Sequence, residues 1–317
     1  MKHLVTLQDW SSESIREVLD RAAEIKAQPA RYHQAMSHRV LVMIFEKPSL
    51  RTRVSFEVGA AQMGGYPIYY DMSTSPLGAG KENIHDTVKV LSRYADIIMA
   101  RLFEHEKLEE MVRYSTIPVI NGLTNFSHPC QVLGDLFTIR EIKGRLEGLT
   151  LTYFGDANNN VTHSLLFACP KMGLNIRIAC PALPEYQPDP AVLEAARRTA
   201  ARTGTRVEIL HEAVPAARGA DVIYTDSWMS YHIPAEQREE RLGRLRPFQV
   251  TSEVMKAAAP DAIFMNCLPA LRGYEQTAEV IDGPQSVVFD QAENRLHVQK
   301  AIMLHLLEEA SGGKPSA

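Results

Sequence analysis

Short apolar runs alternate with amphipathic segments along almost the whole chain. The apolar runs are rich in Val, Ile and Leu, and they predict β-strands at residues 40–45, 67–70, 96–100, 118–121, 149–154, 175–180, 207–210, 221–225, 262–265 and 286–289. Apolar residues at helical spacing predict helices between most of them, for example at 84–94, 106–114 and 191–203. Strands and helices that alternate in this way are typical of parallel sheets with crossover helices.

The predicted strands form two groups, which indicates two sheets and therefore two domains. The amphipathic segment 128–142 lies between the groups and predicts a helix that joins them. A second amphipathic segment, 295–309, predicts a terminal helix that returns to the first domain. We therefore predict an α/β fold of two domains, each a parallel sheet flanked by helices, joined by bridging helices. The predicted domains are 1–142, with the terminal helix 295–311 packed back onto it, and 149–290.

The composition places the chain among ordinary globular proteins. Its 317 residues suit two domains better than one, and 45% hydrophobic residues are enough for sizeable cores. The net charge of -4 gives no global sign of nucleic-acid binding, so any anion site must be a local feature. The sequence has no apolar run of 18 residues and no N-terminal signal core. Four cysteines without a C-x-x-C pair predict neither a disulfide framework nor a thiolate zinc cluster, so a reduced, cytoplasmic location without membrane or nucleic-acid partners fits best.

The most informative segment is 47–53, which lies between the first predicted strand and a helical segment. The hydroxyl groups of Ser49 and Thr52 and the guanidinium groups of Arg51 and Arg53 therefore gather at the first turn of a helix. Free backbone N–H groups and the positive end of the helix dipole lie at the same place, so an anion, most simply a phosphate, can bind there. The alternative is a solvated helix start, with Ser49 as the N-cap and the arginines on an exposed face.

Ligands of open parallel sheets bind beyond the carboxyl ends of the strands, and polar side chains follow several of the predicted strands. Arg101 ends the third strand, where it is either an anion ligand or a surface charge. His128 begins the bridging helix, where it is either a functional group or a structural cap. Asp226 follows strand 221–225, where its carboxylate either meets a substrate ammonium group or caps a turn.

Three further segments have the same two interpretations. The asparagines at 158–160 follow a strong strand; they are good turn formers, but their amides can also hold a carboxylate or an amine. Because this segment lacks the G-x-G-x-x-G spacing, a nicotinamide cofactor is not expected. Cys267 follows strand 262–265 and is either simply buried or part of a site. Arg295 opens the predicted last helix, where an arginine is usually a surface residue.

Taken together, these segments resemble the aspartate/ornithine carbamoyltransferase family, and most closely its members that use ornithine. The matching stretches occur in the family's order and cover nearly the whole chain. They are residues 45–57, 121–124, 128–131, 155–156 with 159–160, 225–228, 267–269 and 290–295. Single stretches are not specific, but the combination is.

The resemblance implies transfer of a carbamoyl group from carbamoyl phosphate to an amine, without a metal or an organic cofactor. With L-ornithine as the acceptor, the products are L-citrulline and phosphate, as in arginine biosynthesis or the urea-cycle type of step. The resemblance also implies a homotrimer or an assembly of trimers, with active sites near subunit boundaries. Two alternatives remain open: another acceptor, such as putrescine or an N-acylated ornithine, and a homologue that binds an anion without turnover.

The resemblance also implies roles for individual positions. The residues implied for carbamoyl phosphate are Ser49, Leu50, Arg51, Thr52, Arg53, Arg101, His128, Gln131, Cys267, Leu268 and Arg295. Those implied for ornithine are Asn160, Asp226, Ser230 and Tyr231. In catalysis, Arg101 and His128 would stabilise the charge that grows on the carbonyl oxygen. Asp226 and Cys267 would assist the loss of a proton from the amine.

Four places depart from the family's pattern. Residues 230–232 read Ser-Tyr-His where ornithine enzymes usually have Ser-Met-Gly. Asn266 replaces the usual His before Cys-Leu-Pro, and Leu271 stands where many relatives have His. These three changes bear on the identity of the amine. Pro76 stands where a Gln or His usually faces the phosphate in a neighbouring subunit, which bears on how a trimer completes its site.

Overall fold

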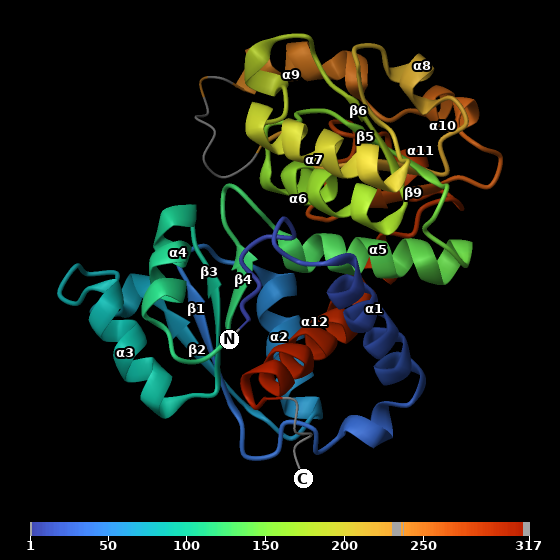
Figure 1. The fold of residues 1–317 in the computed structure, drawn as a ribbon. Coiled ribbons are helices and arrows are strands. Elements are labelled where there is room, and N and C mark those ends of the chain that lie inside the picture. The colour runs from blue at the N-terminus through green and yellow to red at the C-terminus, as the bar shows by residue number, and fades with distance from the viewer. Residues whose placement is uncertain (1, 230–235, 237, 313–317) are drawn as a thin grey trace. The chain divides into compact units, whose positions relative to one another are not determined.

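The chain divides into two compact units (Figure 1). The structure is a computed structural model that describes residues 2–229, 236 and 238–312. Unit 1 comprises Met1–Phe137 and Glu293–Ala317, and unit 2 comprises Thr138–Ala292. Each unit is built on one parallel sheet with flanking helices, which confirms the predicted α/β class. The boundaries between the units fall inside two helices, α5 (Pro129–Lys143) and α12 (Val288–Ala310).

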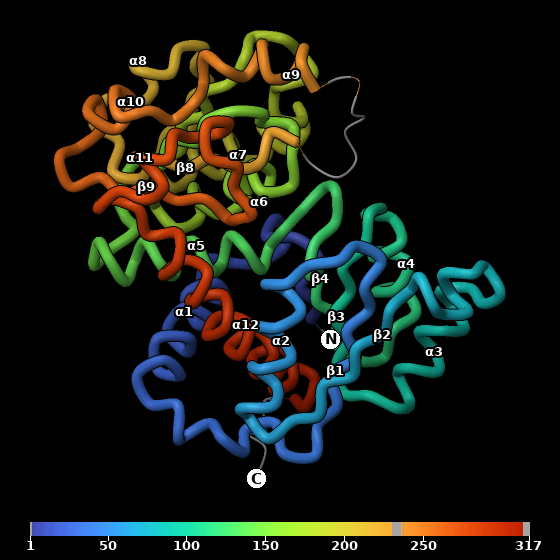
Figure 2. The backbone as a smooth tube through the Cα atoms, turned by 180° about the vertical axis from the view of Figure 1, so that it is seen from behind, coloured from blue at the N-terminus to red at the C-terminus, as the bar shows by residue number. Residues whose placement is uncertain are grey.

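Unit 1 contains a four-stranded sheet in the order β2-β1-β3-β4, with every neighbouring pair parallel. Its strands are β1 (Val40–Phe45), β2 (Tyr66–Asp71), β3 (Ile97–Arg101) and β4 (Val119–Leu123). Its helices, besides parts of α5 and α12, are α1 (Ser12–Ala27), α2 (Leu50–Gln62), α3 (Ile84–Tyr94) and α4 (His105–Tyr114). Figures 1 and 2 show α3 and α4 on one side of this sheet and α1, α2 and α12 on the other. Strands β1, β3 and β4 are accordingly buried along almost their whole length, as their composition predicts, whereas the edge strand β2 is partly exposed.

Unit 2 contains a five-stranded sheet in the order β7-β6-β5-β8-β9, again with parallel neighbours. Its strands are β5 (Thr150–Phe154), β6 (Asn175–Ala179), β7 (Val207–Leu210), β8 (Val222–Thr225) and β9 (Ile263–Asn266). Its helices are α6 (Asn160–Ala168), α7 (Pro190–Thr203), α8 (Ala213–Ala217), α9 (Arg238–Leu245), α10 (Ser252–Ala257) and α11 (Ala278–Ile281). One apolar cluster joins α8, α10 and α11 to strands β5, β8 and β9.

Short 3-10 turns complete the connections. They are η1 (Pro29–Tyr32), η2 (Met72–Thr74), η3 (Pro170–Met172), η4 (Pro184–Tyr186) and η6 (Arg246–Phe248). No helix in the described ranges is long and apolar enough to span a membrane.

The predicted strand at 286–289 is wrong. Ser286 forms only an isolated bridge to Phe264, and α12 begins at Val288, seven residues before the predicted start of the last helix at Arg295. The local run Ser-Val-Val-Phe has high strand propensity, but the fold extends the helix through it, with Val288 buried and Phe289 exposed. Tertiary packing thus overrides a local preference here.

The strand orders place functional segments next to each other. In unit 1 the chain builds outward from β1 to β2 and then continues on the other side with β3, so the topology reverses between β1 and β3. Unit 2 has the same reversal between β5 and β8. Register pairs the last residues of these strands, Phe45 with Arg101 and Phe154 with Thr225. The turns that follow them therefore lie side by side at a topological switch point, where open α/β sheets bind ligands.

Candidate active site

The first turn of α2 begins directly after β1. Ser49 has extended backbone angles, and its hydroxyl accepts a hydrogen bond from the N–H of Thr52 at 3.2 Å, so it is the N-cap. The first N–H groups of a helix have no partner within the helix, and the helix dipole is positive at this end. Arg51 is half-buried, whereas the Leu50 side chain is 74% exposed. The Leu50 side chain is therefore mostly in solvent, while its backbone belongs to the first turn of the helix.

Arg101 reaches this turn from the neighbouring strand. The β3–β4 pairing steps from Ala100–Asn121 to Arg101–Leu123, so Gly122 is an extra residue in β4. A bulge of this kind re-aims the side chain beside it. The buried Arg101 guanidinium donates through Nε to the Lys47 carbonyl at 3.2 Å and through Nη1 to the Thr52 hydroxyl at 3.4 Å. Arg101 is thus buried against the first turn of α2 and is not a surface charge.

Arg295 reaches the same hydroxyl from α12. Its side chain is only 2% exposed, so the expectation of a surface residue at a helix start is wrong. Nη1 donates to Gln131 Oε1 at 2.5 Å, and Nη2 donates to Thr52 Oγ1 at 3.5 Å. Gly134 of α5 makes room for it, because an added Cβ there would lie 3.0 Å from Arg295 Cδ. Burial of this arginine therefore depends on a glycine far away in the sequence.

His128 lies buried among these cations, just before α5. Burial, followed by the positive charges of Arg295, Arg101, Lys47 and Arg51, holds the pKa of His128 well below its usual range. Its imidazole is therefore neutral at pH 7 and can donate one N–H to a bound oxygen without adding another positive charge. The His128 backbone carbonyl also accepts the N–H groups of Gln131 and Val132, so the residue lies at the start of α5, as the cap interpretation predicts. Its functional role stays a prediction.

Two residues of segment 47–53 differ from the sequence-based prediction. Arg53 does not join the buried cations around Thr52. Its guanidinium lies 3.7 Å from the centre of the Tyr69 ring and pairs with Glu57 at 3.0 Å. Lys47 was not singled out, yet it is buried, and its ammonium group lies 5.5 Å from the Phe103 ring centre. The sequence does contain one indication for Lys47, since it is the first cation after β1 and lies in the same segment, 47–53.

In unit 2, Asp226 and Cys267 follow two paired strands. Thr225 at the end of β8 pairs with Asn266 at the end of β9, so the next residues of both strands are neighbours. The Cys267 thiol donates to Asp226 Oδ1 at 2.9 Å, and the same oxygen accepts the N–H of Ser227 at 2.7 Å. Cys267 is only partly buried and faces a carboxylate, so it is not simply a core residue.

Asn266 organises the turn that carries Leu268. Its Oδ1 accepts the N–H of Leu268 at 2.7 Å, and its Nδ2 donates to Gln276 Oε1 at 3.1 Å. Leu268 itself has φ 55°, a left-handed conformation that non-glycine residues rarely adopt. Such conformations persist where the surroundings fix them and are frequent at functional sites. Asn266, the replacement for the usual His, therefore serves the shape of this turn.

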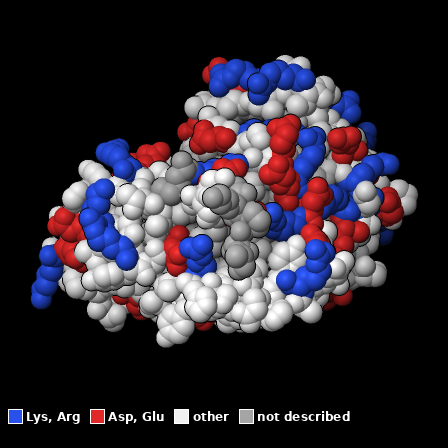
Figure 3. Space-filling view, turned by 60° about the horizontal axis from the view of Figure 1, so that its bottom comes forward, with Lys and Arg blue, Asp and Glu red and all other residues white. Residues whose placement is uncertain are grey.

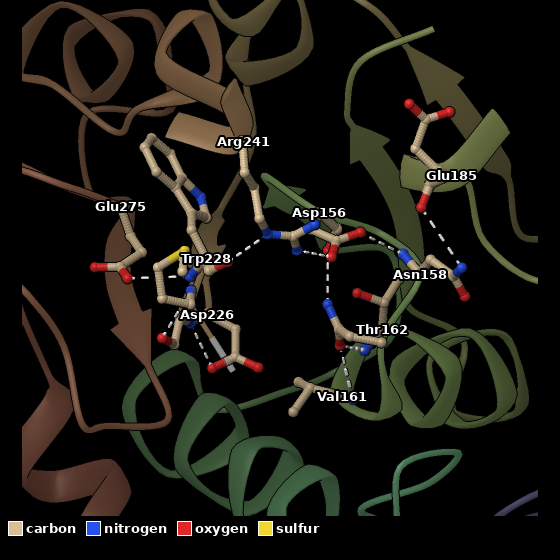
Figure 4. Close-up of polar contacts among 12 residues, drawn as sticks. Asp156, Asn158, Val161, Thr162, Glu185, Asp226, Trp228, Arg241 and Glu275 are labelled. Atoms are coloured by element: carbon tan, nitrogen blue, oxygen red, sulfur yellow. Dashed lines mark hydrogen bonds and ion pairs between the residues drawn. The ribbon is translucent and has the colours of Figure 1, made fainter. Parts of the chain in front are cut away.

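A third segment of unit 2 with predicted site residues follows β5; residues 156, 158, 161 and 162 of this segment are labelled in Figure 4. Asn159 is the N-cap of α6, because its Oδ1 accepts the N–H groups of Val161 and Thr162, each at 2.9 Å. Asn160 is consequently the first residue of α6, and the strand that leads to it, β5, pairs with β8, which leads to Asp226. Asn159 is thus a capping residue, as the turn interpretation predicts. The ligand role of Asn160 stays a prediction.

Some predicted positions cannot be placed in either cluster. Ser230 and Tyr231, together with His232, lie outside the described residues. Pro76 lies in the connection between η2 and α3, where its carbonyl accepts the N–H groups of Lys81 at 2.9 Å and Glu82 at 3.3 Å.

The charged character of the site is local. On the face drawn in Figure 3, Lys and Arg side chains are interspersed with Asp and Glu side chains. The cations around His128 are instead largely buried, which strengthens their interaction with a bound anion. Within residues 2–229, 236 and 238–312, no group of three or more His, Cys, Asp or Glu side chains could hold a metal ion.

Comparison with known proteins gives two family models that match the chain. The model described as the carbamoyl-P binding domain of aspartate/ornithine carbamoyltransferase matches residues 2–141. The model described as the Asp/Orn binding domain of the same enzymes matches residues 147–306.

Similar proteins match over nearly their full length. The ornithine carbamoyltransferase of Thermococcus kodakarensis is 50% identical over 304 residues, which cover 95% of each chain. That of Methanothermobacter thermautotrophicus is 50% identical over 307 residues, covering 97% of this chain and 99% of the relative. Among solved structures, the ornithine carbamoyltransferase from Pyrococcus furiosus superposes with a TM-score of 0.92 at 48% identity and covers 96% of this chain and 97% of its own.

Proposed function

The chain belongs to the aspartate/ornithine carbamoyltransferase family, and we propose that it transfers the carbamoyl group of carbamoyl phosphate to the side-chain amine of L-ornithine, giving L-citrulline and phosphate. The observation that carries this proposal is the convergence of Arg101 and Arg295 on the Thr52 hydroxyl at the N-terminus of α2. Buried guanidinium groups at a helix start suit a phosphate, because planar N–H pairs and the helix dipole act on the same oxygens.

We assign carbamoyl phosphate to domain 1–142 with helix 295–311, and the amine to domain 149–290. The phosphate would be held by the side chains of Ser49, Arg51 and Thr52 and by the Leu50 backbone, with Arg53 farther out as a source of positive charge. The residues assigned to the carbamoyl group are Arg101, His128, Gln131 and Arg295. Fixed donors of this kind are already oriented before the reaction starts, so they require little reorganisation during it.

The acceptor residues are assigned from the same reasoning. A carboxylate suits an ammonium group, so Asp226 would hold the α-amino group of ornithine, and the Asn160 amide would hold the α-carboxylate. Ser230 and Tyr231 would complete this pocket. Cys267 and the Leu268 backbone would meet the attacking amine and the carbamoyl NH2 group. Aspartate is a poor acceptor here because Asp226 would repel its second carboxylate.

In the reaction, the uncharged Nδ of ornithine attacks the carbonyl carbon. A C–N bond forms, the C–O bond to the phosphorus-bound oxygen breaks, and phosphate leaves with that electron pair and takes up the proton that Nδ loses. Negative charge grows on the carbonyl oxygen, where Thr52, Arg101 and the neutral His128 can donate. Removal of one such donor typically costs about 2.7–4 kcal/mol of barrier.

The ornithine side chain must first lose a proton, because the pKa of such an amine is about 10.4. The Asp226 carboxylate can take this proton directly or through the Cys267 thiol, which donates to Oδ1 at 2.9 Å. The protein forms no covalent bond, so the rest of the acceleration would come from positioning the two substrates.

We also propose that the chain works as a homotrimer or an assembly of trimers in the cytoplasm. Exposed apolar side chains on α2 and on the edge strand β2 support an interface there: Leu50 is 74% exposed and Tyr66 67%, with Val54 and Ile68 beside them in sequence. Such side chains on an edge strand usually mark a contact surface. The four cysteines are free, which suits a reducing compartment. Light scattering should give about three times the 35.4 kDa chain mass or a multiple of that value, and a monomer would contradict the proposal.

The test of the activity is an assay of the purified protein with carbamoyl phosphate and a panel of acceptors. The panel contains L-ornithine, putrescine, N-acetylornithine, N-succinylornithine and aspartate. We expect turnover to be fastest with ornithine. No turnover with any acceptor would contradict an enzyme, and a preference for putrescine or an acylated ornithine would contradict the assigned acceptor.

A further inference from the structure

Arg241 of α9 lies between two of the acceptor segments (Figure 4). Its Nε donates to the Trp228 carbonyl at 2.6 Å, and its Nη2 forms an ion pair with Asp156 Oδ2. Its guanidinium carbon lies 5.2 Å from the centre of the Tyr186 ring. The side chains of Arg241 and Asp156 are 14% and 12% exposed, so this ion pair is largely shielded from water. One planar group thus joins the turn after β5 to the turn after β8.

At the first end, Asp156 fixes the turn that leads to Asn160. Its Oδ1 accepts the N–H of Asn158 at 2.9 Å. Its carbonyl accepts the Tyr153 hydroxyl at 2.9 Å and the Asn159 amide at 2.6 Å. Because Asn159 caps α6, the position of Asp156 is transmitted directly to Asn160, the first residue of that helix.

At the second end, two residues after Asp226, both backbone polar groups of Trp228 are hydrogen-bonded to charged side chains. Its N–H donates to Glu275 Oε1 at 3.1 Å, while its carbonyl accepts Arg241. Its indole packs against Gly155, where φ is +121° and an added Cβ would lie 2.7 Å from Nε1. The peptide groups on both sides of Trp228 are therefore fixed by buried charged groups, and this fixes the direction in which Asp226 leaves β8.

A general contribution to folding does not account for this arrangement well. Buried ion pairs are weak stabilisers compared with apolar side chains of similar volume, because both charges lose their hydration. Arg241 also does not join two core elements. It joins two turns at the switch point of the sheet, and each turn carries a residue assigned to the amino-acid end of the acceptor.

We propose that Arg241 is a positioning residue that sets the spacing between Asn160 and Asp226, and with it the affinity and the length selectivity for the amine acceptor. This inference rests on the proposed function, since it takes ornithine as the acceptor. Arg241 does not touch the substrate. It acts through Asp156 on one side and through the Trp228 carbonyl on the other.

The test compares steady-state kinetics of Arg241→Gln, Arg241→Lys and the wild type, with ornithine and carbamoyl phosphate varied in turn. Arg241→Gln should raise the KM for ornithine about tenfold to 100-fold, the size expected when a ligand group is misplaced by roughly 1 Å. The KM for carbamoyl phosphate should stay within about twofold of the wild type, because the residues assigned to its phosphate group lie in unit 1. Arg241→Lys keeps the charge but loses the two-pronged bridge, so it should be intermediate. The preference for ornithine over lysine, measured as a ratio of kcat/KM values, should be highest in the wild type, lower in Arg241→Lys and lowest in Arg241→Gln.

Two controls separate positioning from folding. Arg244→Gln removes the same charge from the same helix, where the Arg244 side chain is 56% exposed, and it should leave both KM values unchanged. Asp156→Asn should raise the ornithine KM as Arg241→Gln does, and the double variant should be no worse than the poorer single one, because both changes break one interaction.

The outcomes are distinguishable. A wild type that does not carbamoylate ornithine overturns the proposed function. A wild type that does so, with an unchanged ornithine KM in Arg241→Gln, overturns the positioning role. A lower kcat and melting temperature with both KM values unchanged means a structural role only and also overturns it. If Arg241→Gln does not fold, Arg241→Lys and Asp156→Asn decide by the same criteria.

Discussion

Unit 1 and unit 2 carry their functional residues at equivalent points of their sheets, but they hold them in different ways. In unit 1 the residues assigned to the substrate bind one another, as Arg101 and Arg295 do at Thr52. In unit 2 the assigned residues lie on separate turns that are joined by a residue outside the set, Arg241. The first arrangement is a compact cluster of cations, and the second is a set of turns kept at a fixed spacing.

The difference reflects the charges that each substrate presents. A phosphate is one dense anion, so several cations can surround it. Burial first, and then the charges of these cations, hold the pKa of His128 well below its usual range. An amino acid carries separate ammonium and carboxylate groups, and these must be met at two points a set distance apart. Loss of a charge should therefore dominate in unit 1, and loss of spacing should matter in unit 2.

The largest effect is expected for Arg101→Gln. The change removes a buried guanidinium that donates to the Thr52 hydroxyl at 3.4 Å and can stabilise the carbonyl oxygen. Steady-state assays should show kcat lower by about 10²- to 10³-fold, as for the loss of one oxyanion donor. The control is Arg93→Gln, which removes an exposed arginine from α3 of the same unit. A nearly unchanged kcat in Arg101→Gln would show that Arg101 does not stabilise the carbonyl oxygen.

Asp226→Asn should have the next largest effect. The change keeps the size of the side chain but removes the charge that would meet the acceptor's ammonium group. The KM for ornithine should rise by the equivalent of about 2–3 kcal/mol, toward the low end for a broken charge pair because Asp226 is only half-buried. The KM for carbamoyl phosphate should not change.

Asp261→Asn is the matched control in unit 2. Its carboxylate is exposed and pairs with Lys143 at 2.8 Å, so its loss should change the stability little and leave the kinetics unchanged. If Asp226→Asn unfolds while Asp261→Asn does not, Asp226 serves the structure of the turn rather than the acceptor.

Arg101 and Asp226 could be found from the sequence because Arg101 ends one apolar run and Asp226 directly follows another. The same holds for Ser49, Thr52 and Cys267, since a strand end is a local signal and the switch point of a parallel sheet brings strand ends together. Their roles came from the family resemblance, because a hydroxyl or thiol at a strand end has several possible functions. The roles of Ser230 and Tyr231 remain predictions.

Other features depended on contacts that no local pattern records. The burial of Arg295 follows from the space at Gly134, and the start of α12 at Val288 contradicts a run with strand propensity. Arg241 stands in a segment rich in charged residues, which in sequence looks like a solvated helix face. Only the fold shows that this one arginine turns inward to Asp156.

A change of packing alone should weaken the cluster of unit 1 less than a loss of charge. In Gly134→Ala the new methyl group would lie 3.0 Å from Arg295 Cδ, so the arginine must shift and its bond to Gln131 must lengthen. Overpacking of this kind costs about 1–3 kcal/mol, and the KM for carbamoyl phosphate should rise roughly tenfold. The KM for ornithine should change less, because Gly134 and Arg295 belong to unit 1 and the residues assigned to ornithine belong to unit 2.

Gly243→Ala is the matched control for Gly134→Ala. It introduces the same methyl group into a helix, α9, at a site where an added Cβ meets nothing within 4 Å. Alanine favours the helix by up to about 1 kcal/mol over glycine, so this variant should be as active as the wild type and slightly more stable. Equal losses in both variants would show that the Arg295 contact is not the cause.

The smallest effect is a difference between the units in their response to acid. Burial lowers the pKa of five histidines that all belong to unit 1, namely His3, His105, His128, His297 and His305. The folded unit then binds fewer protons than the unfolded chain, so its stability is greatest at and above pH 6.5, the ordinary pKa, and falls as the pH drops below it. In unit 2, burial raises the pKa of Glu275 from the ordinary 4.5. That carboxylate destabilises its unit as the pH rises, so acid should recover stability there.

The chain has two tryptophans, and each reports on one unit: Trp10 on unit 1 and Trp228 on unit 2. In the Trp228→Phe variant, tryptophan fluorescence therefore follows the thermal unfolding of unit 1. In the Trp10→Phe variant it follows the unfolding of unit 2. Between pH 7.5 and 5.5 the unit 1 transition should fall further, by about 2–4 °C for each kcal/mol lost. Addition of phosphate at pH 5.5 should restore it selectively, because an anion among the cations near His128 favours the folded state of that unit. An equal or larger acid shift in unit 2 would contradict the assignment of the acid-sensitive groups to unit 1.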